Sequence, residues 1–452
     1  MAGVVNSLVQ QSDATVAVTE NRILTGNFAP VVEEVECEDL EVVGALPPEL
    51  NGTLLRAGPN PINPDVNHHW FTGDGMIHAV ELGNGRAISY RNRWVRTDAV
   101  EVALGLAAAP GPRLDGQGSG NVNIIAHGDK ILALSEQGLP IEMNGQGETI
   151  QIYDYEGRLA SNMTAHPKID GQTGELFFFG YDFAPPFLRY HHANKQGELI
   201  NTVDIELPRP VMMHDFGVTA TRVIFMDLPV VLSLEMASQG KSIPFCWSDD
   251  HQARLGVMDR NAVSDTTVWI DIEPCFVFHP LNCFDDGSDI VMDVVRFPKL
   301  FVDSESDEET APELVRWRID VDAKRVTSTL ISSVPQEFPR VNPHYECYPH
   351  RYGYTLEAGG DLGFGSLLKH DLRDGSTLRH DVGTGCAASE PIFVATGDEE
   401  DEGYILSVVY KADTHTSELV VVDARRFEEE PVAKIPLGAR VPFGFHGNFV
   451  PN

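Results

Sequence analysis

Four histidines, His166, His214, His279 and His446, share one local setting, with apolar residues on one side and a proline, aspartate or glycine on the other. A short apolar run that stops at such a breaker is typical of a buried strand, and we expect Pro280 to end the strand that carries His279. A single buried imidazole is more often a core residue with one hydrogen-bond partner than a metal ligand. The repetition of the setting is therefore the informative feature.

The spacing of the four histidines excludes a local metal motif. They are separated by about 50, 65 and 170 residues, unlike the two histidines of a His-Glu-x-x-His helix. Only a fold that gathers strand ends around one axis would bring them together, as a β-propeller does. His78 and His127 lie in predicted strands and remain alternatives. The other histidines have polar or turn contexts and are expected at the surface: His68, His69, His191, His192, His251, His344, His350, His370, His380 and His415.

The elements that must position these histidines are short strands. Apolar or alternating segments recur from residue 40 onward, separated by turn pairs such as Asn51-Gly52, Asn84-Gly85 and Asp286-Gly287. Such pairs are typical of hairpins, because the turn needs positive φ angles. Long amphipathic helical patterns are almost absent. The candidate strands are 76–82, 87–95, 130–134, 175–180, 222–227, 289–295, 314–321, 404–410 and 418–423.

This pattern predicts an all-β protein with one large closed architecture, because no change in composition marks a linker. A β-propeller fits best, since radial repetition leaves only short sheet edges. No repeat of fixed period is found, so a double sandwich stays open as an alternative.

Composition and charge exclude several partners. The chain has 452 residues, 42% of them hydrophobic, which is enough to form a large core. Its formal net charge is −34, from 67 acidic and 33 basic residues. Nucleic acid and anionic lipid both need basic patches, so we expect neither nucleic-acid binding nor electrostatic attachment to membranes.

The cysteines and apolar segments bear on location. Six cysteines without a Cys-x-x-Cys pair, and no basic leader followed by an apolar run, predict a cytoplasmic protein. No segment reaches the roughly 18 apolar residues that a membrane-spanning helix needs. Residues 100–109 and 228–234 are shorter apolar runs. The first would lie in a membrane interface, cap a pocket, or form a short core helix or mobile loop.

Seven short motifs, in this order, resemble the carotenoid cleavage oxygenase family, which includes stilbene-cleaving dioxygenases and the retinoid isomerohydrolase. Each motif is weak alone, but together they span residue 35 to the end of the sequence. They are Leu54-Leu55-Arg56-Ala57-Gly58-Pro59-Asn60-Pro61, Gly73-Asp74-Gly75-Met76-Ile77-His78-Ala79, His166-Pro167-Lys168, His214-Asp215-Phe216-Gly217, Phe278-His279, Ser389-Glu390-Pro391-Ile392-Phe393-Val394 and Phe445-His446-Gly447.

The resemblance implies a seven-bladed β-propeller over residues 35–452, after a partly ordered N-terminal extension, 1–34, with loops and a short helix capping an axial metal site. It implies one Fe(II) per chain, bound by His166, His214, His279 and His446. It also implies three glutamates, Glu136, Glu337 and Glu390, behind the ligands. A carboxylate that accepts the second N–H of an imidazole fixes its tautomer and raises its basicity.

The implied reaction is oxidative cleavage of a conjugated C=C bond, with O₂ as co-substrate, into two carbonyl products. Four neutral imidazoles leave positions open on an octahedral ion. No residue is required as a general acid or base, and the protein's part is to position the alkene and exclude water.

An extended apolar substrate requires an apolar tunnel. The motif positions imply Phe71, Trp94, Ser135, Met212 and Phe278 as substrate-binding residues, although each aromatic could equally be core. Stilbene-cleaving relatives tend to place a lysine where this chain has Ser135, and they supply a tyrosine hydroxyl that Arg93-Trp94-Val95 lacks. A carotenoid or apocarotenoid is therefore favoured.

Three other functions remain open: stilbenoid or phenylpropanoid cleavage, a retinyl-ester isomerohydrolase, and a binding scaffold without catalysis. The family resemblance further implies peripheral membrane contact through residues 100–109 and 228–234, which the acidic surface would make hydrophobic in character. The sequence predicts no oligomeric state.

Overall fold

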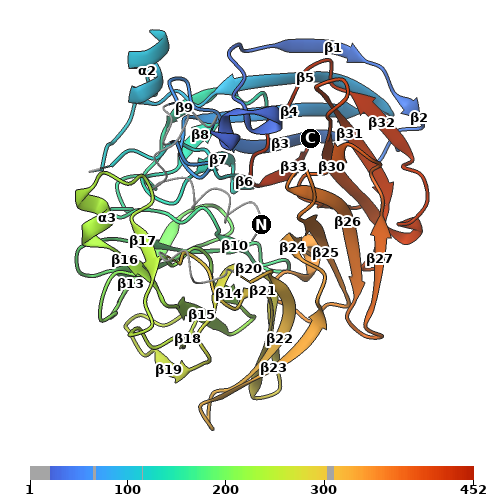
Figure 1. Ribbon diagram of the computed structural model, residues 1–452. Coiled ribbons are helices and arrows are strands. Elements are labelled where there is room, and N and C mark those ends of the chain that lie inside the picture. Colours follow the sequence, from blue (N-terminus) through green and yellow to red (C-terminus); the bar gives the residue numbers. More distant parts are fainter. Residues whose placement is uncertain (1–20, 65–67, 115, 303–309) are drawn as a thin grey trace, which may run out of the picture.

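Tight hairpins join many of the neighbouring strands in the computed structural model, which describes residues 21–64, 68–114, 116–302 and 310–452 (Figure 1). Asn84-Gly85 connects β4 (Gly75–Gly83) to β5 (Arg86–Trp94), and both turn residues have positive φ, 52° and 71°. This turn matches the twist of the flanking strands, and the predicted hairpin is confirmed. The hairpin predicted at Asn51-Gly52 is wrong, because Gly52 begins β3 (Gly52–Pro59), which pairs with β4 and β33.

Seven antiparallel sheets stand around a common centre as the blades of a β-propeller, which confirms the predicted fold (Figure 1). The first blade has the strand order β1 (Glu36–Leu40), β5, β4, β3 and β33 (Gly447–Pro451). Four blades use strands that are consecutive in the sequence. These are β6 (Asn123–His127), β7 (Lys130–Leu134), β8 (Ile141–Met143) and β9 (Thr149–Ile152); β10 (Lys168–Ile169), β11 (Leu176–Tyr181), β12 (Leu188–Ala193) and β13 (Leu199–Ile205); β20 (Phe276–Asp286), β21 (Asp289–Phe297), β22 (Glu313–Asp320) and β23 (Arg325–Ser332); and β24 (Gln336–Arg340), β25 (Tyr352–Ala358), β26 (Phe364–Asp371) and β27 (Ser376–His380).

The two remaining blades depart from this plan. One has the order β14 (Gly217–Val218), β15 (Arg222–Asp227), β18 (Arg254–Asp259) and β19 (Val268–Asp271), because the separate pair β16 (Val230–Leu232) and β17 (Phe245–Trp247) is inserted. The last has the order β2 (Val43–Gly44), β32 (Ala433–Pro436), β31 (Thr416–Asp423), β30 (Gly403–Lys411) and β28 (Cys386–Ala387), and β29 (Ile392–Ala395) also pairs with β30.

Two strand pairings close the ring. β33 pairs with β3, so a strand from the C-terminal part completes the first blade. β2 pairs with β32, so a strand from the N-terminal part completes the last blade. Both closures are antiparallel, so in these two blades strands from the N-terminal and C-terminal parts of the described chain share one sheet.

The inner strands surround the axis. Contacts link β33 with β6, β14 with β20 and β20 with β24. The main apolar core extends between the blades and includes Phe177, Phe225, Phe276 and Phe278, all fully buried or nearly so. These contacts and the apolar core between the blades pack several of the inner strands against one another around the centre.

β20 does not end at Pro280, contrary to the prediction from the sequence. The strand continues to Asp286, and its pairing with β21 shifts register on both sides of Pro280. A proline cannot donate to the ladder, and a β-bulge accommodates it while bending the strand. The bulge lies beside His279.

Several histidines expected at the surface are buried instead. His191 and His192 on β12, His370 on β26 and His380 on β27 are each at most 4% exposed, and His251 is also buried. Each has a hydrogen-bond partner, such as Thr202 for His191. Their polar and turn-forming neighbours in the sequence led to the prediction of surface positions, although these histidines lie in or beside buried strands.

The N-terminal segment packs on the propeller. Residues 1–20 of the predicted extension 1–34 lie outside the described residues. The 3₁₀-helices η2 (Arg22–Leu24) and η3 (Gly26–Phe28) follow, and Phe28 contacts the rings of Trp70 and Phe443. Two further 3₁₀-helices are η4 (Pro343–Tyr345) and η5 (Ala424–Arg426).

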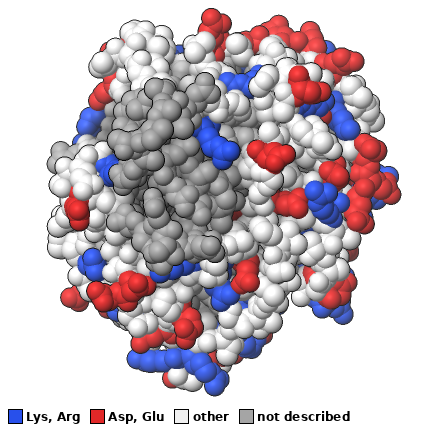
Figure 2. All heavy atoms as spheres, viewed as in Figure 1, with Lys and Arg blue, Asp and Glu red and all other residues white. Residues whose placement is uncertain are grey.

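Two short helices lie at the edge of the ring in Figure 1. α2 (Asp98–Leu104) begins at Thr97, whose hydroxyl accepts the Val100 N–H, and it ends at Gly105, whose φ of 69° suits glycine. α3 (Leu234–Ser238) begins at Ser233 in the same way. Acidic and basic side chains are interspersed over the face shown in Figure 2.

Candidate metal centre

The four predicted histidines come from four different blades and meet near the axis. His166 and His214 precede the inner strands β10 and β14, His279 lies in β20, and His446 directly precedes β33. The ring of His166 lies 4.3, 4.8 and 4.7 Å, centroid to centroid, from the rings of His214, His279 and His446. The remaining alternatives, His78 and His127, are partnered elsewhere, by Tyr90 and by the Gly174 carbonyl.

The three glutamates lie behind three of these histidines. Glu337 Oε2 is 2.6 Å from His279 Nδ1, and Glu390 Oε1 is 2.7 Å from His446 Nδ1. Glu136 Oε1 lies 2.9 Å from His214 Nδ1, and the Tyr181 hydroxyl donates to the other oxygen of Glu136. In His279 and His446, whose Nδ1 is hydrogen-bonded to a carboxylate, the neutral imidazole presents Nε2 as its free ligand atom.

Burial and neighbouring charges set the protonation of the cluster. Burial, together with the other three imidazoles, lowers the pKa of His166 well below its ordinary range. Burial lowers the pKa of His279 more than Glu337 raises it. For His214, burial lowers the pKa but Glu136 more than offsets this, so the pKa is raised. Two of the four histidines are thus held neutral, the form in which imidazole binds a metal.

Two atom positions fit a bound cation. His214 Nε2 and His279 Nε2 are 3.2 Å apart, close to the roughly 3 Å between adjacent ligands about 2.1 Å from one ion. When both Nδ1 atoms carry the proton, these nitrogens face each other with lone pairs, which a cation between them would stabilise. His166 Nε2 is buried and makes no hydrogen bond within the described residues.

The surrounding charges fit a bound cation. The carboxylates of Glu136, Glu337, Glu390 and Asp215 lie within ion-pair distance of the histidines, and their cationic neighbours are Lys168 beside Asp215 and Arg340 beside Glu390. The buried Arg56 also interacts with Glu390. The carboxylates behind the histidines favour a cation among the neutral imidazoles.

Arg340 and Asn448 support Glu390 from behind. Arg340 Nη1 is 3.5 Å from Glu390 Oε1, and its Nη2 donates to Asn448 Oδ1 at 2.6 Å. Glu390 also accepts the Gly447 N–H. Burial raises the pKa of Glu390, but Arg340 and His446 outweigh it, so the carboxyl is held ionised at neutral pH.

Aromatic rings pack against several of the histidines. Phe278 contacts His214 edge-on at 5.0 Å and Phe71 at 5.8 Å. Phe338, which sequence reasoning missed, lies 5.8 Å from the His279 ring and 5.2 Å from the His446 ring. Its position directly after Glu337 in the sequence could have indicated that Phe338 lies at the site. Phe278, predicted as a substrate-binding residue, therefore lies at the cluster, and Phe71, also predicted, packs against Phe278 and Phe445.

The other three predicted substrate-binding residues pack in apolar clusters or make hydrogen bonds to the backbone. Trp94 packs with Met76 and Val100 in a separate small apolar cluster. Ser135 uses its hydroxyl to donate to the Gln137 carbonyl at 2.7 Å. Met212, two residues before His214, is buried in the main core, and its N–H donates to the Val230 carbonyl.

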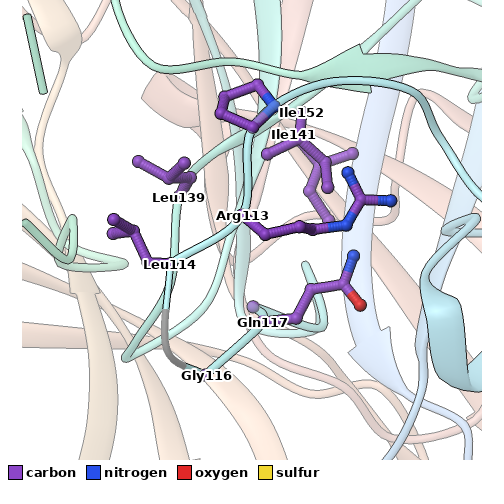
Figure 3. A pocket seen from close by; sticks show the side chains of 9 residues that line it. Arg113, Leu114, Gly116, Gln117, Leu139, Ile141 and Ile152 are labelled. Carbon is purple, nitrogen blue, oxygen red and sulfur yellow. The ribbon is translucent and has the colours of Figure 1, made fainter. Parts of the chain in front are cut away.

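A small hollow near Ser135 is unsuited to a large ligand. It is lined by Arg113, Leu114, Gln117, Leu139 and neighbouring residues (Figure 3). Its volume is about 10 Å³, roughly enough for one water molecule. The Arg113 guanidinium that borders it is paired with Asp98.

Together, these features define a β-propeller whose axial histidines, His166, His214 and His279 among them, have the arrangement of a metal site. The model of the retinal pigment epithelial membrane protein family matches residues 28–451. A carotenoid cleavage oxygenase of Mycobacterium tuberculosis is 35% identical, with 97% of this chain and 99% of that protein aligned. A carotenoid 9,10(9′,10′)-cleavage dioxygenase of Crocus sativus is 34% identical over 94% and 88% of the two chains.

Solved structures agree with the sequence comparisons. The lignostilbene dioxygenase of Pseudomonas brassicacearum superposes with a TM-score of 0.88 at 26% identity, covering 97% of this chain and 100% of that one. Cobalt-substituted Synechocystis ACO gives a TM-score of 0.84 at 27% identity over 94% and 97%. The chain belongs to the carotenoid cleavage oxygenase family.

Proposed function

We propose that this protein is an Fe(II)-dependent dioxygenase that cleaves a conjugated C=C bond of a carotenoid or apocarotenoid into two carbonyl products. The observation that carries this proposal is the group of four axial histidines, three of them next to a glutamate. The relatives named as carotenoid cleavage dioxygenases support the same class of enzyme.

The proposed ligands are His166, His214, His279 and His446, for one Fe(II) per chain. When bound, the iron supplies the reactivity toward O₂ that an alkene lacks, and the two oxygen atoms end in the two carbonyl groups. No external reductant is needed, because alkene and O₂ together contain the atoms and electrons of both products.

The side chains of this chain fix the ligands and exclude water. Glu337 and Glu390 hold the Nδ1 protons of His279 and His446, which leaves each Nε2 free for the metal. Phe278, only 1% exposed, covers His214 on one side. An apolar wall of this kind orients a polyene by shape and keeps water from the reacting bond.

An apolar substrate is favoured over a hydroxystilbene. A phenol would need a polar or cationic partner, and the hydroxyl of Ser135, next to Glu136, is already bonded to the backbone. Stilbenoid cleavage remains the second candidate, because the lignostilbene dioxygenase is so similar in fold. A retinyl-ester isomerohydrolase would use the same site without consuming O₂.

The test is purification without oxygen, loading with Fe(II), and exposure to air with an apocarotenal or a hydroxystilbene. We expect about one iron per chain, O₂ uptake, and two carbonyl fragments from the apocarotenal by mass spectrometry. Cleavage of the stilbene alone would overturn the substrate class. Iron without O₂ uptake would favour the isomerohydrolase, and no bound iron would favour a non-catalytic scaffold.

Peripheral membrane contact is a second part of the proposal. Among the described residues, no helix is long and apolar enough to cross a bilayer. Val102 on α2 is 88% exposed and Leu234 on α3 is 77% exposed, and both helices lie at the left edge of the ring in Figure 1. Most of 228–234 is unsuited to this role, because Leu228, Val230 and Val231 are buried.

Liposome flotation tests the membrane contact. Replacing both Val102 and Leu234 with serine is expected to reduce flotation with neutral-lipid vesicles several-fold. Val263, 83% exposed in the segment between β18 and β19, provides the matched control V263S. Equal flotation of the V102S/L234S and V263S proteins would contradict the assignment of this surface.

A further inference from the structure

His166 differs from the other three histidines because no glutamate oxygen lies within hydrogen-bond distance of it among the described residues. The nearest carboxylate oxygens are Asp215 Oδ2, 3.8 Å from Nδ1, and Glu136 Oε1, 3.9 Å from Nε2. Something other than a glutamate must hold the segment that carries His166.

An ion pair joins that segment to the one carrying His214. Lys168, two residues after His166, places Nζ 2.9 Å from each oxygen of Asp215, the residue that follows His214. Asp215 is 1% exposed, and its Oδ1 also accepts the Phe216 N–H. Because both carboxylate oxygens of Asp215 contact the Lys168 ammonium group, and one also accepts a backbone N–H, the position of Asp215 is fixed relative to Lys168.

A second tie lies on the other side of His166. The fully buried Thr164 donates its hydroxyl to the His214 carbonyl at 3.3 Å and accepts the His166 N–H at 3.1 Å. The stretch 164–168 is thus fastened to 214–215 at both ends, with His166 between the two ties.

We propose that the Lys168–Asp215 ion pair positions His166 relative to His214, and so takes for His166 the part that a glutamate plays for the other three ligands. It acts between two blades, since Lys168 begins β10 and Asp215 precedes β14. This inference rests on the proposed metal centre. A charged pair suits the task, because it resists sliding of one blade edge against the other more than an apolar contact would.

The experiment titrates the metal-free, full-length protein with Co(II) and records affinity and the visible ligand-field absorption of the bound ion. K168M and D215N are each expected to lose 10- to 100-fold in Co(II) affinity, the usual effect of residues behind metal ligands. The absorption bands should change shape. K168R, which keeps the charge, should recover most of the affinity, and K168M/D215N should resemble the single variants.

A matched control separates positioning from general stability. Asp227 is fully buried and paired with Arg254 at 2.7 Å on β15 and β18. D227N should lower the thermal midpoint while leaving Co(II) affinity within about twofold. H279A should abolish tight binding.

The outcomes distinguish the two proposals. If the wild-type protein binds no Co(II), the metal centre itself fails. If the wild type binds it and H279A does not, but K168M and D215N keep wild-type affinity and spectrum, the ion pair is only structural and this inference is overturned.

Discussion

His279 and Glu337 meet at 2.6 Å although each lies at a break in the register of its own strand. The pairing of β20 with β21 shifts between Val277 and Pro280, and the pairing of β24 with β25 shifts between Glu337 and Arg340. Phe338, directly after Glu337, has a φ of 53°, a left-handed conformation that costs a phenylalanine about 1 kcal/mol. The two bulges turn these side chains toward each other at the axis.

Removing His279 should separate metal binding from folding. H279A is expected to lower iron content at least several-fold and to abolish cleavage, because one of four proposed ligands is lost. The far-UV circular dichroism should stay close to wild type. The matched control is H370Q, which replaces a buried histidine on β26 bonded to Thr355 and Thr377. If H279A kept wild-type iron and activity, His279 would not be a ligand.

Glu390 should matter less than the histidine it holds. E390Q keeps the shape but weakens acceptance of the His446 N–H, so metal affinity or activity should fall about 10- to 100-fold. Glu142, which is also buried and is paired with Lys130 on another blade, provides the control E142Q. Full metal affinity in E390Q would assign Glu390 a purely structural role at the start of β33.

Ser135 should influence the choice between an apocarotenal and a hydroxystilbene. S135K introduces a cation next to Glu136, which a phenolic oxygen can use and a polyene cannot. We expect the ratio of kcat/KM values to move toward the hydroxystilbene by about tenfold, or roughly 1.4 kcal/mol. Competition assays with both substrates measure this ratio. An unchanged ratio would show that position 135 does not contact the substrate end.

Buried neutral histidines should make the protein sensitive to mild acid. Burial lowers the pKa of His350 and His370 to about 4 and that of His191 to about 3. Below about pH 6.5 the unfolded chain binds protons at these positions and the folded chain does not. The free energy of unfolding therefore falls as the pH decreases, by on the order of 2 kcal/mol per histidine at pH 5.

Urea unfolding of the metal-free protein at pH 7.5 and pH 5.0 measures this effect. In H370Q the fall in unfolding free energy between the two pH values should be smaller by about 2 kcal/mol, even if its stability is lower at both. Equal falls in wild type and H370Q would mean that His370 takes up its proton in the folded state.

The fold and the gathering of the four histidines were largely predictable from the sequence. The strands expected at 130–134 and 222–227 have those bounds in the structure. The setting shared by His166, His214, His279 and His446 reflects a real common position, at or near the inner strand of a blade. Local patterns succeed here because strand and turn signals are themselves local.

Other features could not be predicted because they depend on distant partners. Lys168 and Asp215 are 47 residues apart, and nothing near either residue indicates the pair. Pro280 predicts the end of a strand, but β20 continues past it because a β-bulge accommodates the proline. Trp94 occupies a motif position, yet it packs with Met76 and Val100 because of how α2 lies against the first blade. Of residues 228–234, most are core rather than surface.

The pairing of β33 with β3 makes completion of the first blade depend on synthesis of the C-terminal strand. His446 directly precedes β33, and among the described strands β33 is synthesised last while β3 is one of the first. During translation, six blades can therefore form while the first blade still lacks its innermost strand and the histidine group lacks one member. Residues from His446 onward must therefore be synthesised before all four histidines can meet, so the histidine group is completed only when β33 closes the ring.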